Sequence, residues 1–233
     1  MKFSFFGKAE LLLRLNPART QTRVSKKFDF FRKVELLRPV ANCQFMSAGV
    51  KIHSTMQIRF ATPNDIEHCL QLDASSETRR VWQLDLRESR DQVAAHLRSA
   101  TLPRELRLDY PSPDDALLLH WQRGYCIMVA EDWAGDGVVG YVDIGPEPDM
   151  QTGWIWHLVI DRRRRRQGIG SALLRAAIQW SSDHQLHRLM APVPTQNDPS
   201  VRFFQRHGFA FCGFHDRYYR TGSVALFFGR ELR

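Results

Sequence analysis

The stretch Arg165-Arg166-Gln167-Gly168-Ile169-Gly170-Ser171 combines two arginines with two glycines placed two residues apart. Arginine forms charge-assisted hydrogen bonds with phosphate oxygens. Glycine lets an anion approach the backbone because it carries no side chain. A helix that begins at Gly168 would also direct its first N–H groups and the positive end of its dipole at the anion. The stretch therefore predicts a site for a phosphate or pyrophosphate group.

A strand and a helix are expected on either side of this stretch. Residues 154–160 are apolar apart from His157, which is typical of a strand covered on both faces. Residues 168–184 carry apolar side chains at helical spacing, namely Ile169, Leu173, Ala177 and Trp180. A strand that leads through a glycine-containing turn into a helix commonly binds anions. The elements thus agree with the chemistry of the stretch.

The rest of the chain from residue 56 alternates strand and helix patterns. We expect further strands at 56–60, 126–130, 138–144, 189–193, 209–214 and 223–228. Helices are expected to begin at Thr62-Pro63-Asn64-Asp65, to cover 87–98, and to run from Asp198 to Gly208. Residues 101–115, which contain three prolines, are expected to form a loop or a short insertion. This order predicts one mixed α/β domain around a partly antiparallel sheet.

Positive charge is confined to the first 55 residues. They hold eleven Lys/Arg and three Asp/Glu, whereas residues 56–233 hold 22 of each, so the net charge of +8 belongs to the first segment. Such a break in composition marks a boundary. We expect 1–55 to be a basic N-terminal extension, disordered or not native, and 56–233 to be the domain. A targeting leader and an amphipathic docking arm are alternatives for the extension.

The body gives no sign of a nucleic-acid or membrane partner. Residues 56–233 have no net charge and so lack the positive field typical of nucleic-acid binding. No apolar run approaches the roughly 20 residues that cross a bilayer. The four cysteines form no C-x-x-C pair and match no zinc spacing. We therefore expect no metal site and a reducing, cytoplasmic location.

Two motifs resemble the GNAT superfamily of N-acetyltransferases. The family signature Q/R-x-x-G-x-G/A, set between a strand and a helix, stands here as Arg165 to Gly170. Downstream, Asn197, Phe203-Phe204 and Gly208-Phe209 match a second family motif. The resemblance covers about residues 56–231 in the order of elements. It implies a single α/β domain with a mixed, partly antiparallel sheet flanked by helices.

The resemblance also implies acetyl-CoA as the co-substrate. The backbone of Leu158, Val159 and Ile160 would pair with the pantetheine amides, as an added strand pairs with a sheet edge. An N–H of that segment would stabilise the oxyanion of the tetrahedral intermediate. Residues 165–171 would hold the pyrophosphate, and Asn197 would lie near the pantetheine arm. An amine would attack the acetyl group directly.

The residues for proton transfer depart from the family pattern. Phe204 stands where many members have a tyrosine that protonates the leaving thiolate. Pro192 stands where members that acetylate ribosomal-protein N-termini have a glutamate. Weak candidates for acid or base remain, and these are Tyr218, Tyr219 and Asp143.

His157 is a further candidate base. Strict alternation along its strand places it on the face opposite Trp154, Trp156 and Leu158, where it would pack under a helix. The aromatic residues Trp82, Trp121 and Tyr125 lie in the variable region that contributes to the acceptor side in the family. Together with Trp154 and Trp156 they suggest an apolar or aromatic acceptor.

We therefore expect an acyltransferase that moves an acetyl group from acetyl-CoA to an amine of a small molecule or peptide. A lysine amine with a pKa near 10.4 is only about 0.04% neutral at pH 7, whereas an α-amine near 7.8 is about 14% neutral. A site without an evident base thus favours α-amines and other weakly basic amines. The alternative is a module that binds acyl-CoA without turnover, as a sensor or scaffold. The sequence leaves a homodimer open.

Overall fold

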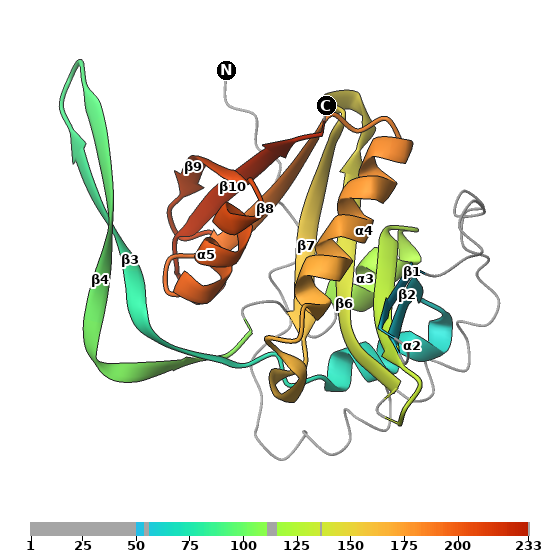
Figure 1. Ribbon diagram of the computed structural model, residues 1–233. Coiled ribbons are helices and arrows are strands. Elements are labelled where there is room, and N and C mark those ends of the chain that lie inside the picture. Colours follow the sequence, from blue (N-terminus) through green and yellow to red (C-terminus); the bar gives the residue numbers. More distant parts are fainter. Residues whose placement is uncertain (1–49, 54–55, 111–115, 136, 233) are drawn as a thin grey trace, which may run out of the picture. The chain divides into compact units, whose positions relative to one another are not determined.

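The computed structural model describes residues 50–53, 56–110, 116–135 and 137–232 (Figure 1). Most of the predicted N-terminal extension lies outside the described residues. The domain boundary at Met56 stays a prediction. Strand β1 (Val50–His53) precedes it and pairs antiparallel with β2 (Met56–Phe60), so the sheet already includes residues before Met56.

The main sheet has eight strands in the order β1-β2-β5-β6-β7-β8-β10-β9. Its remaining strands are β5 (Cys126–Asp132), β6 (Gly137–Glu147), β7 (Thr152–Ile160), β8 (Arg188–Pro194), β9 (Ala210–His215) and β10 (Ala225–Glu231). All neighbours are antiparallel except β7 and β8, which run parallel. The predicted mixed, partly antiparallel sheet is confirmed.

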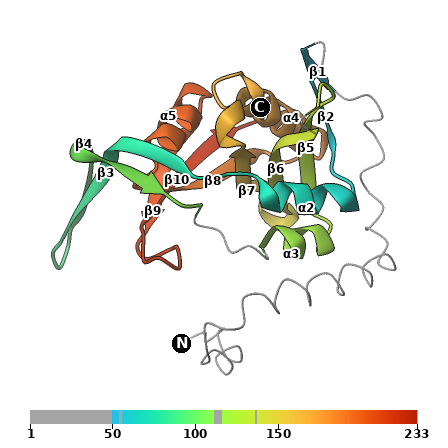
Figure 2. The same cartoon turned by 90° about the horizontal axis from the view of Figure 1, so that it is seen from below.

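Helices cover both faces of this sheet (Figure 2). They are α2 (Pro63–Gln71), α3 (Ala116–Gln122), α4 (Ile169–Asp183) and α5 (Asp198–Arg206), with 3-10 turns η2 (Pro148–Met150) and η3 (Arg162–Arg164). One core cluster joins α4 and α5 to the sheet, and it contains Leu173, Leu174 and Val201. A second cluster joins α2 and α3 to the other face through Ile66 and Leu117. Among the described residues, no helix is long and apolar enough to cross a membrane.

The first helix begins where its capping residues predict. Thr62 is the N-cap, Pro63 follows it, and Asp65 accepts hydrogen bonds from the backbone N–H and the hydroxyl of Thr62. Asp65 is buried and also binds the Arg59 guanidinium, with Nη1 to Oδ2 at 2.6 Å. Arg59 in turn binds Glu131 on β5. The cap therefore ties α2 to two strands of the sheet.

The helix predicted at 87–98 and the loop predicted at 101–115 were wrong where the structure describes them. Residues 76–108 form a long hairpin of β3 (Ser76–Glu88) and β4 (Val93–Leu108). Apolar side chains alternate along both strands, and Leu84 pairs with Leu97 while Leu86 pairs with Ala95. This period of two places them on one face, which favours strands over a helix.

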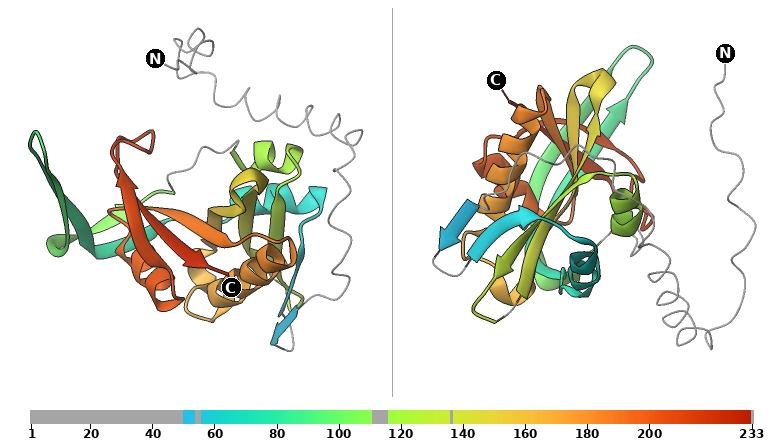
Figure 3. Two further views of the ribbon diagram at one scale, coloured as in Figure 1. Left: turned by 90° about the horizontal axis from the view of Figure 1, so that it is seen from above. Right: turned by 90° about the vertical axis from the view of Figure 1, so that its right-hand side faces the viewer.

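The hairpin of β3 and β4, coloured from teal to green, can be followed in Figure 3. It is fastened to the body at Trp82. The backbone N–H of Trp82 donates to the carbonyl of Thr195, and its indole Nε1 donates to the Asp198 carboxylate at 3.0 Å. Asp198 opens α5. Trp82 therefore supports the start of this helix, and it packs against the α4-side core.

Strands β7 and β8 separate soon after they meet. Their pairing is limited to Thr152–Arg188, Gly153–Leu189 and Trp154–Met190. Beyond Trp154, β7 pairs with β6 alone, and no described strand lies against its other edge. This separation leaves the outer edge of β7 from Ile155 to Ile160 without a described strand partner. Two of its backbone groups are engaged otherwise, because the Ile160 carbonyl accepts from Arg165 and the Leu158 backbone is hydrogen-bonded to Tyr110.

Candidate functional site

The N-terminus of α4 has no side-chain cap. Gly168 is its N-cap, and its φ of 84° lies in the left-handed region that favours glycine. By contrast, Asn197 caps α5 by accepting a hydrogen bond from the N–H of Ser200 at 3.1 Å. The first N–H groups of α4 therefore keep the hydrogen-bonding capacity that an anion requires.

Three of the five consecutive arginines are engaged within the protein. Arg162 forms an ion pair with Glu77, and Arg164 forms one with Asp132. Arg165 donates through Nε to the carbonyl of Ile160 at 3.0 Å. Burial lowers the pKa of Arg165. Its side chain thus holds the end of β7, although the motif predicted a phosphate contact for it.

Arg166 is the arginine best placed for a ligand. It is exposed, its φ is 65°, and its side chain has no hydrogen bond or ion pair with any described residue. It directly precedes Gln167 and Gly168 at the uncapped end of α4. The side chain of Arg163 is equally exposed and unengaged among these residues, but it lies on η3.

Gly170 and Ser171 lie where α4 packs against α5. A Cβ added to Gly170 would stand 3.5 Å from the Phe203 ring, an ordinary van der Waals distance, so the packing of the helices leaves room for a methyl group here. The hydroxyl of Ser171 lies 3.0 Å from Nε2 of His207, whose Nδ1 donates to the Phe203 carbonyl at 2.8 Å. Ser171 therefore ties the uncapped end of α4 to the end of α5.

The predicted pantetheine segment lies along the open edge of β7. Leu158, Val159 and Ile160 pair with β6 on one side and face no described strand on the other. The Asn197 side chain lies beyond the end of β8, at the start of α5. Its oxygen caps the helix, which leaves its amide N–H groups to donate elsewhere. The residues of this predicted segment thus lie on the open edge of β7, and Asn197 lies at the start of α5. Their contact with a cofactor stays a prediction.

Asp143 belongs to a buried cluster with two histidines. Its Oδ2 lies 2.5 Å from Nδ1 of His120 and 3.1 Å from Nδ1 of His157. The Asp143 carboxylate is fully buried, and its Oδ1 has no hydrogen-bond partner in the described structure. His120 lies on α3, a helix that the sequence analysis does not predict.

The three side chains could also ligate a metal ion, since their donor atoms lie within 4.8 Å of one another. Two ligands bound about 2.0 Å from a tetrahedral zinc lie about 3.3 Å apart. The separation of 2.5 Å between His120 and Asp143 is instead that of a short hydrogen bond. The observed arrangement favours proton chemistry.

The predicted orientation of His157 was wrong in part. Asp143 pairs with His157 and Ile144 pairs with Ile155, so Trp156 is an extra residue on β7. This β-bulge breaks the alternation and turns both Trp156 and His157 toward His120, with ring centroids 5.9 Å and 5.5 Å away. His157 does pack under a helix, namely α3.

Aromatic rings surround this cluster. The ring of Tyr125 lies 4.9 Å from that of His120, and Trp154 stacks on Trp156 at 5.6 Å. Trp154 also contacts Phe227, which contacts Tyr218. We call the rings of Trp154, Trp156 and Tyr125 the aromatic wall. Tyr125 is the one residue outside β7 that the sequence assigned to the acceptor side and that belongs to this wall. Trp82 supports α5, and Trp121 packs in the α2–α3 core.

Tyr218 borders the aromatic wall through Phe227, and Tyr219 contacts Tyr218. Burial raises the pKa of both hydroxyls. Both therefore stay protonated at neutral pH and can donate hydrogen bonds. Transfer of a proton to a thiolate, whose conjugate thiol has a pKa near 8.5, is uphill from such groups. Their high proton affinity suits a binding role better than that of a general acid.

Phe204 and Pro192 are structural residues. Phe204 is buried in the α4-side core, where it contacts Phe203 and Phe209. Pro192 lies on β8 opposite Phe227. Neither residue offers a group that could transfer a proton.

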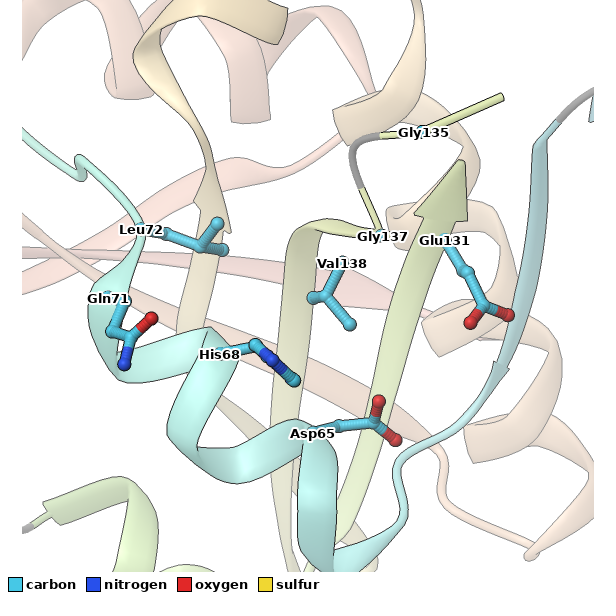
Figure 4. A pocket seen from close by; sticks show the side chains of 8 residues that line it. All are labelled: Asp65, His68, Gln71, Leu72, Glu131, Gly135, Gly137 and Val138. Carbon is cyan, nitrogen blue, oxygen red and sulfur yellow. The ribbon is translucent and has the colours of Figure 1, made fainter. Parts of the chain in front are cut away.

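A separate pocket lies between α2 and the β5–β6 turn (Figure 4). Its volume is about 380 Å³, and its lining includes His68 and the carboxylates of Asp65 and Glu131. Both carboxylates form ion pairs with the single guanidinium of Arg59. The pocket shares no residue with the α4 terminus or with the histidine cluster.

Comparison with known proteins agrees with the geometry. The model of the acetyltransferase (GNAT) family matches residues 91–209, just over half of the chain. L-methionine sulfoximine/L-methionine sulfone acetyltransferase of Pseudomonas aeruginosa is 34% identical over 114 residues, which are 48% of this chain and 62% of that protein. The match thus spans less than two thirds of that relative.

A second relative is matched over more of its length. Streptothricin acetyltransferase of Streptomyces lavendulae is 27% identical over 197 residues, covering 75% of this chain and 94% of that protein. Its match therefore includes most of the described domain.

Two solved structures share the fold. A nourseothricin acetyltransferase has a TM-score of 0.65 and 22% identity, over 77% of this chain and 100% of that one. A streptothricin acetyltransferase homologue from Bacillus anthracis, solved with acetyl coenzyme A, has a TM-score of 0.57 and 17% identity, over 76% and 99%. By its sequence match and its fold, the chain belongs to the GNAT acetyltransferase family.

Proposed function

We propose that this protein is an N-acetyltransferase that moves the acetyl group of acetyl-CoA to an amine. The observation that carries the proposal is the uncapped N-terminus of α4 beside the gap between β7 and β8. A pyrophosphate at that helix end and an extended pantetheine arm along β7 need these two features. Family membership supports the same assignment.

The cofactor contacts follow from this placement. The backbone N–H groups of Gly168, Ile169, Gly170 and Ser171 would bind the pyrophosphate, with Arg166 and Gln167 beside them. The β7 edge at Leu158–Ile160 would align the thioester, and an N–H there would stabilise the oxyanion. Asn197 would donate to the pantetheine arm. Arg165 would act by holding the β7 end in place.

A small-molecule amine is the proposed acceptor. The relatives described above are named for methionine sulfoximine, methionine sulfone and streptothricin. Trp154, Trp156 and Tyr125 give an aromatic wall on which an apolar or cationic acceptor can lie. Asp143, Tyr218 and Tyr219 all border this wall or the cluster behind it. A reducing, cytoplasmic setting suits the cysteines, since no disulfide joins those that the structure describes.

Turnover with defined amines tests the proposal. The full chain is incubated with acetyl-CoA and, in turn, L-methionine sulfoximine, a streptothricin, phenylethylamine and a short peptide with a free α-amine. Release of the CoA thiol and a product heavier by one acetyl group are the expected results. A chain that binds acetyl-CoA and acetylates none of these would favour the non-catalytic sensor or scaffold.

A further inference from the structure

The negative charge of the buried Asp143 carboxylate has no positively charged partner when both neighbouring histidines are neutral. A carboxylate removed from water is costly unless it is paired and hydrogen-bonded. Oδ2 of Asp143 is hydrogen-bonded to Nδ1 of His120 and lies 3.1 Å from Nδ1 of His157, whereas Oδ1 has no hydrogen-bond partner among the described residues. A proton taken up by one of the histidines would complete an ion pair. Nδ1 of His120 and Oδ2 of Asp143 thus form a buried hydrogen-bonded pair in which the carboxylate keeps one oxygen without a described partner.

His120 is the histidine that can exchange this proton with a ligand. Its side chain keeps 13% of its surface exposed, compared with 4% for His157. Its Nδ1 is committed to Asp143, so the neutral ring carries its lone pair on Nε2. Among the described residues, Nε2 of His120 makes no hydrogen bond. A carboxylate that fixes the tautomer of a histidine and stabilises its imidazolium is a well-established arrangement for a general base.

The β-bulge places this pair next to the expected thioester. The extra residue Trp156 and its neighbour His157 lie just beyond Trp154, the last β7 residue that pairs with β8. Leu158, the first residue of the pantetheine segment, follows directly. Helix α4, whose N-terminus is uncapped, covers one face of the sheet, and α3 covers the opposite face (Figure 2). Cofactor and acceptor would thus approach the β7–β8 gap from opposite faces.

We propose that His120 is the general base of the acetyl transfer, that Asp143 is its positioning residue, and that the acceptor enters from the α3 face beside Tyr125 and Trp156. This inference rests on the proposed acetyltransferase function and adds to it the base and the acceptor side. His120 on α3 would thus supply the base that is missing at Pro192, where some family members have a glutamate. The aromatic rings favour an acceptor that arrives as an ammonium cation.

The proposed step balances in protons and bonds. The acceptor ammonium gives one proton to Nε2 of His120 and becomes a neutral amine. Its nitrogen attacks the thioester carbon, a C–N bond forms, and the C–S bond breaks. The second proton leaves the nitrogen and is taken up by the departing CoA thiolate. The His120 imidazolium then releases its proton to water, so that one proton is produced for each acetylated ammonium.

A substitution that keeps the hydrogen bond but removes the base tests this role. In His120→Asn the amide can still donate to Asp143, whereas it cannot accept a proton. We expect kcat/KM at pH 7 to fall about 10²- to 10³-fold with the best acceptor of the panel. The dissociation constant for acetyl-CoA should stay within about twofold. The loss should shrink as the pH approaches the pKa of the acceptor amine, because that amine then needs no base.

His68→Asn is the matched control, since His68 is exposed on α2 and should leave every parameter unchanged. Asp143→Asn is the second variant, because its amide would donate to Nδ1 and reverse the tautomer of His120. Asp143→Asn should likewise lower kcat/KM most at neutral pH and least near the pKa of the acceptor amine. Proton NMR of the wild-type chain should show a far-downfield imidazole N–H that disappears in His120→Asn, a readout that needs no acceptor.

The outcomes separate this inference from the proposed function. Folded His120→Asn that keeps kcat/KM within about twofold and the wild-type pH profile would overturn the base and leave the acetyltransferase intact. A wild-type chain without the downfield signal, or one whose signal persists in His120→Asn, would also overturn it. A wild-type chain that binds acetyl-CoA and acetylates no amine would overturn both the reaction and its base.

Discussion

At the scale of single residues, the glycine and arginine motif divides into parts with different tasks. Gly168 supplies a left-handed backbone, Ser171 binds His207 at the end of α5, and Arg165 holds the end of β7. Arg166 remains exposed and unengaged by the described residues. The sequence motif predicts a phosphate site as a whole, but only the fold distinguishes a ligand contact from a structural one.

Replacement of Arg166 should weaken cofactor binding selectively. A charge-assisted hydrogen bond contributes about 1.5–3 kcal/mol, so Arg166→Ala should raise the dissociation constant of CoA by at least about tenfold. Arg163→Ala is the matched control, because it removes an equally exposed arginine from η3. Isothermal titration measures both. Equal affinities for the two variants would contradict a phosphate contact by Arg166.

Gly145 is a residue that the sequence did not mark and that the aromatic wall requires. A Cβ at this position would stand 2.4 Å from Nε1 of Trp156 and 2.6 Å from the Tyr125 ring. Gly145→Ala should therefore displace both rings and raise the KM for the acceptor. Affinity for acetyl-CoA should persist, because the phosphate site lies on α4. An unchanged acceptor KM would argue against this wall as the acceptor site.

At the scale of elements, periodicity predicted the strands and helices that bear the motif. The strand at 154–160, the helix after Gly168 and the cap at Thr62 all lie where their residue types indicate. The region 87–108 failed because charged residues between the apolar ones obscured a period of two. The β-bulge at Trp156 had no signal in the sequence, and neither did the approach of His120 to Asp143, because both depend on tertiary pairing.

The hairpin should depend in part on the indole of Trp82. Trp82→Phe removes the hydrogen bond to Asp198 and leaves a partly buried carboxylate oxygen with one partner fewer. We expect the free energy of unfolding to fall by about 1–2 kcal/mol in urea titrations. Trp133→Phe removes a comparable bond to Glu131 at an indole that is 55% exposed, and should cost close to nothing. If both variants lost the same free energy of unfolding, the buried bond from Trp82 to Asp198 would be worth no more than the exposed one.

At the scale of the whole molecule, the charge break at residue 55 and the sheet do not coincide. Composition places the start of the domain at Met56, whereas β1 begins at Val50 and extends the sheet beyond β2. Composition reports where charges gather, and strand pairing depends on the backbone. For this reason the sequence could predict the fold class while leaving the edge of the domain unsettled.

Acid should destabilise the molecule through the Arg59 network. Hydrogen bonds from Arg59 hold the pKa of Glu131 below its ordinary value of 4.5. Burial raises the pKa of Asp65, but hydrogen bonds from Arg59 and Thr62 outweigh it and the net pKa lies below 3.8. Depressed carboxyl pKa values add stability above the unfolded-state pKa, and this stability is lost as the pH falls through the folded-state values.

The free energy of unfolding should therefore decline from about pH 5 to about pH 3. In Arg59→Met the decline over this interval should be smaller, because the two carboxyls lose the partner that depresses their pKa. Arg188→Met breaks an exposed ion pair with Glu231 and should keep the wild-type slope. Urea titrations at several pH values compare the three proteins. A wild-type slope in Arg59→Met would contradict the assignment.

The most direct test of the account is isothermal titration of acetyl-CoA into the full chain beside Gly168→Trp. A Cβ at Gly168 meets nothing within 4 Å, so an indole there would occupy the space at the uncapped helix end. Gly222→Trp is the control, because Gly222 has a similar φ of 80° and equally open surroundings on the β9–β10 connection. We expect the wild type and Gly222→Trp to bind acetyl-CoA and Gly168→Trp not to bind it. A folded wild type that fails to bind acetyl-CoA, or a Gly168→Trp variant that binds it equally well, would contradict the central claim.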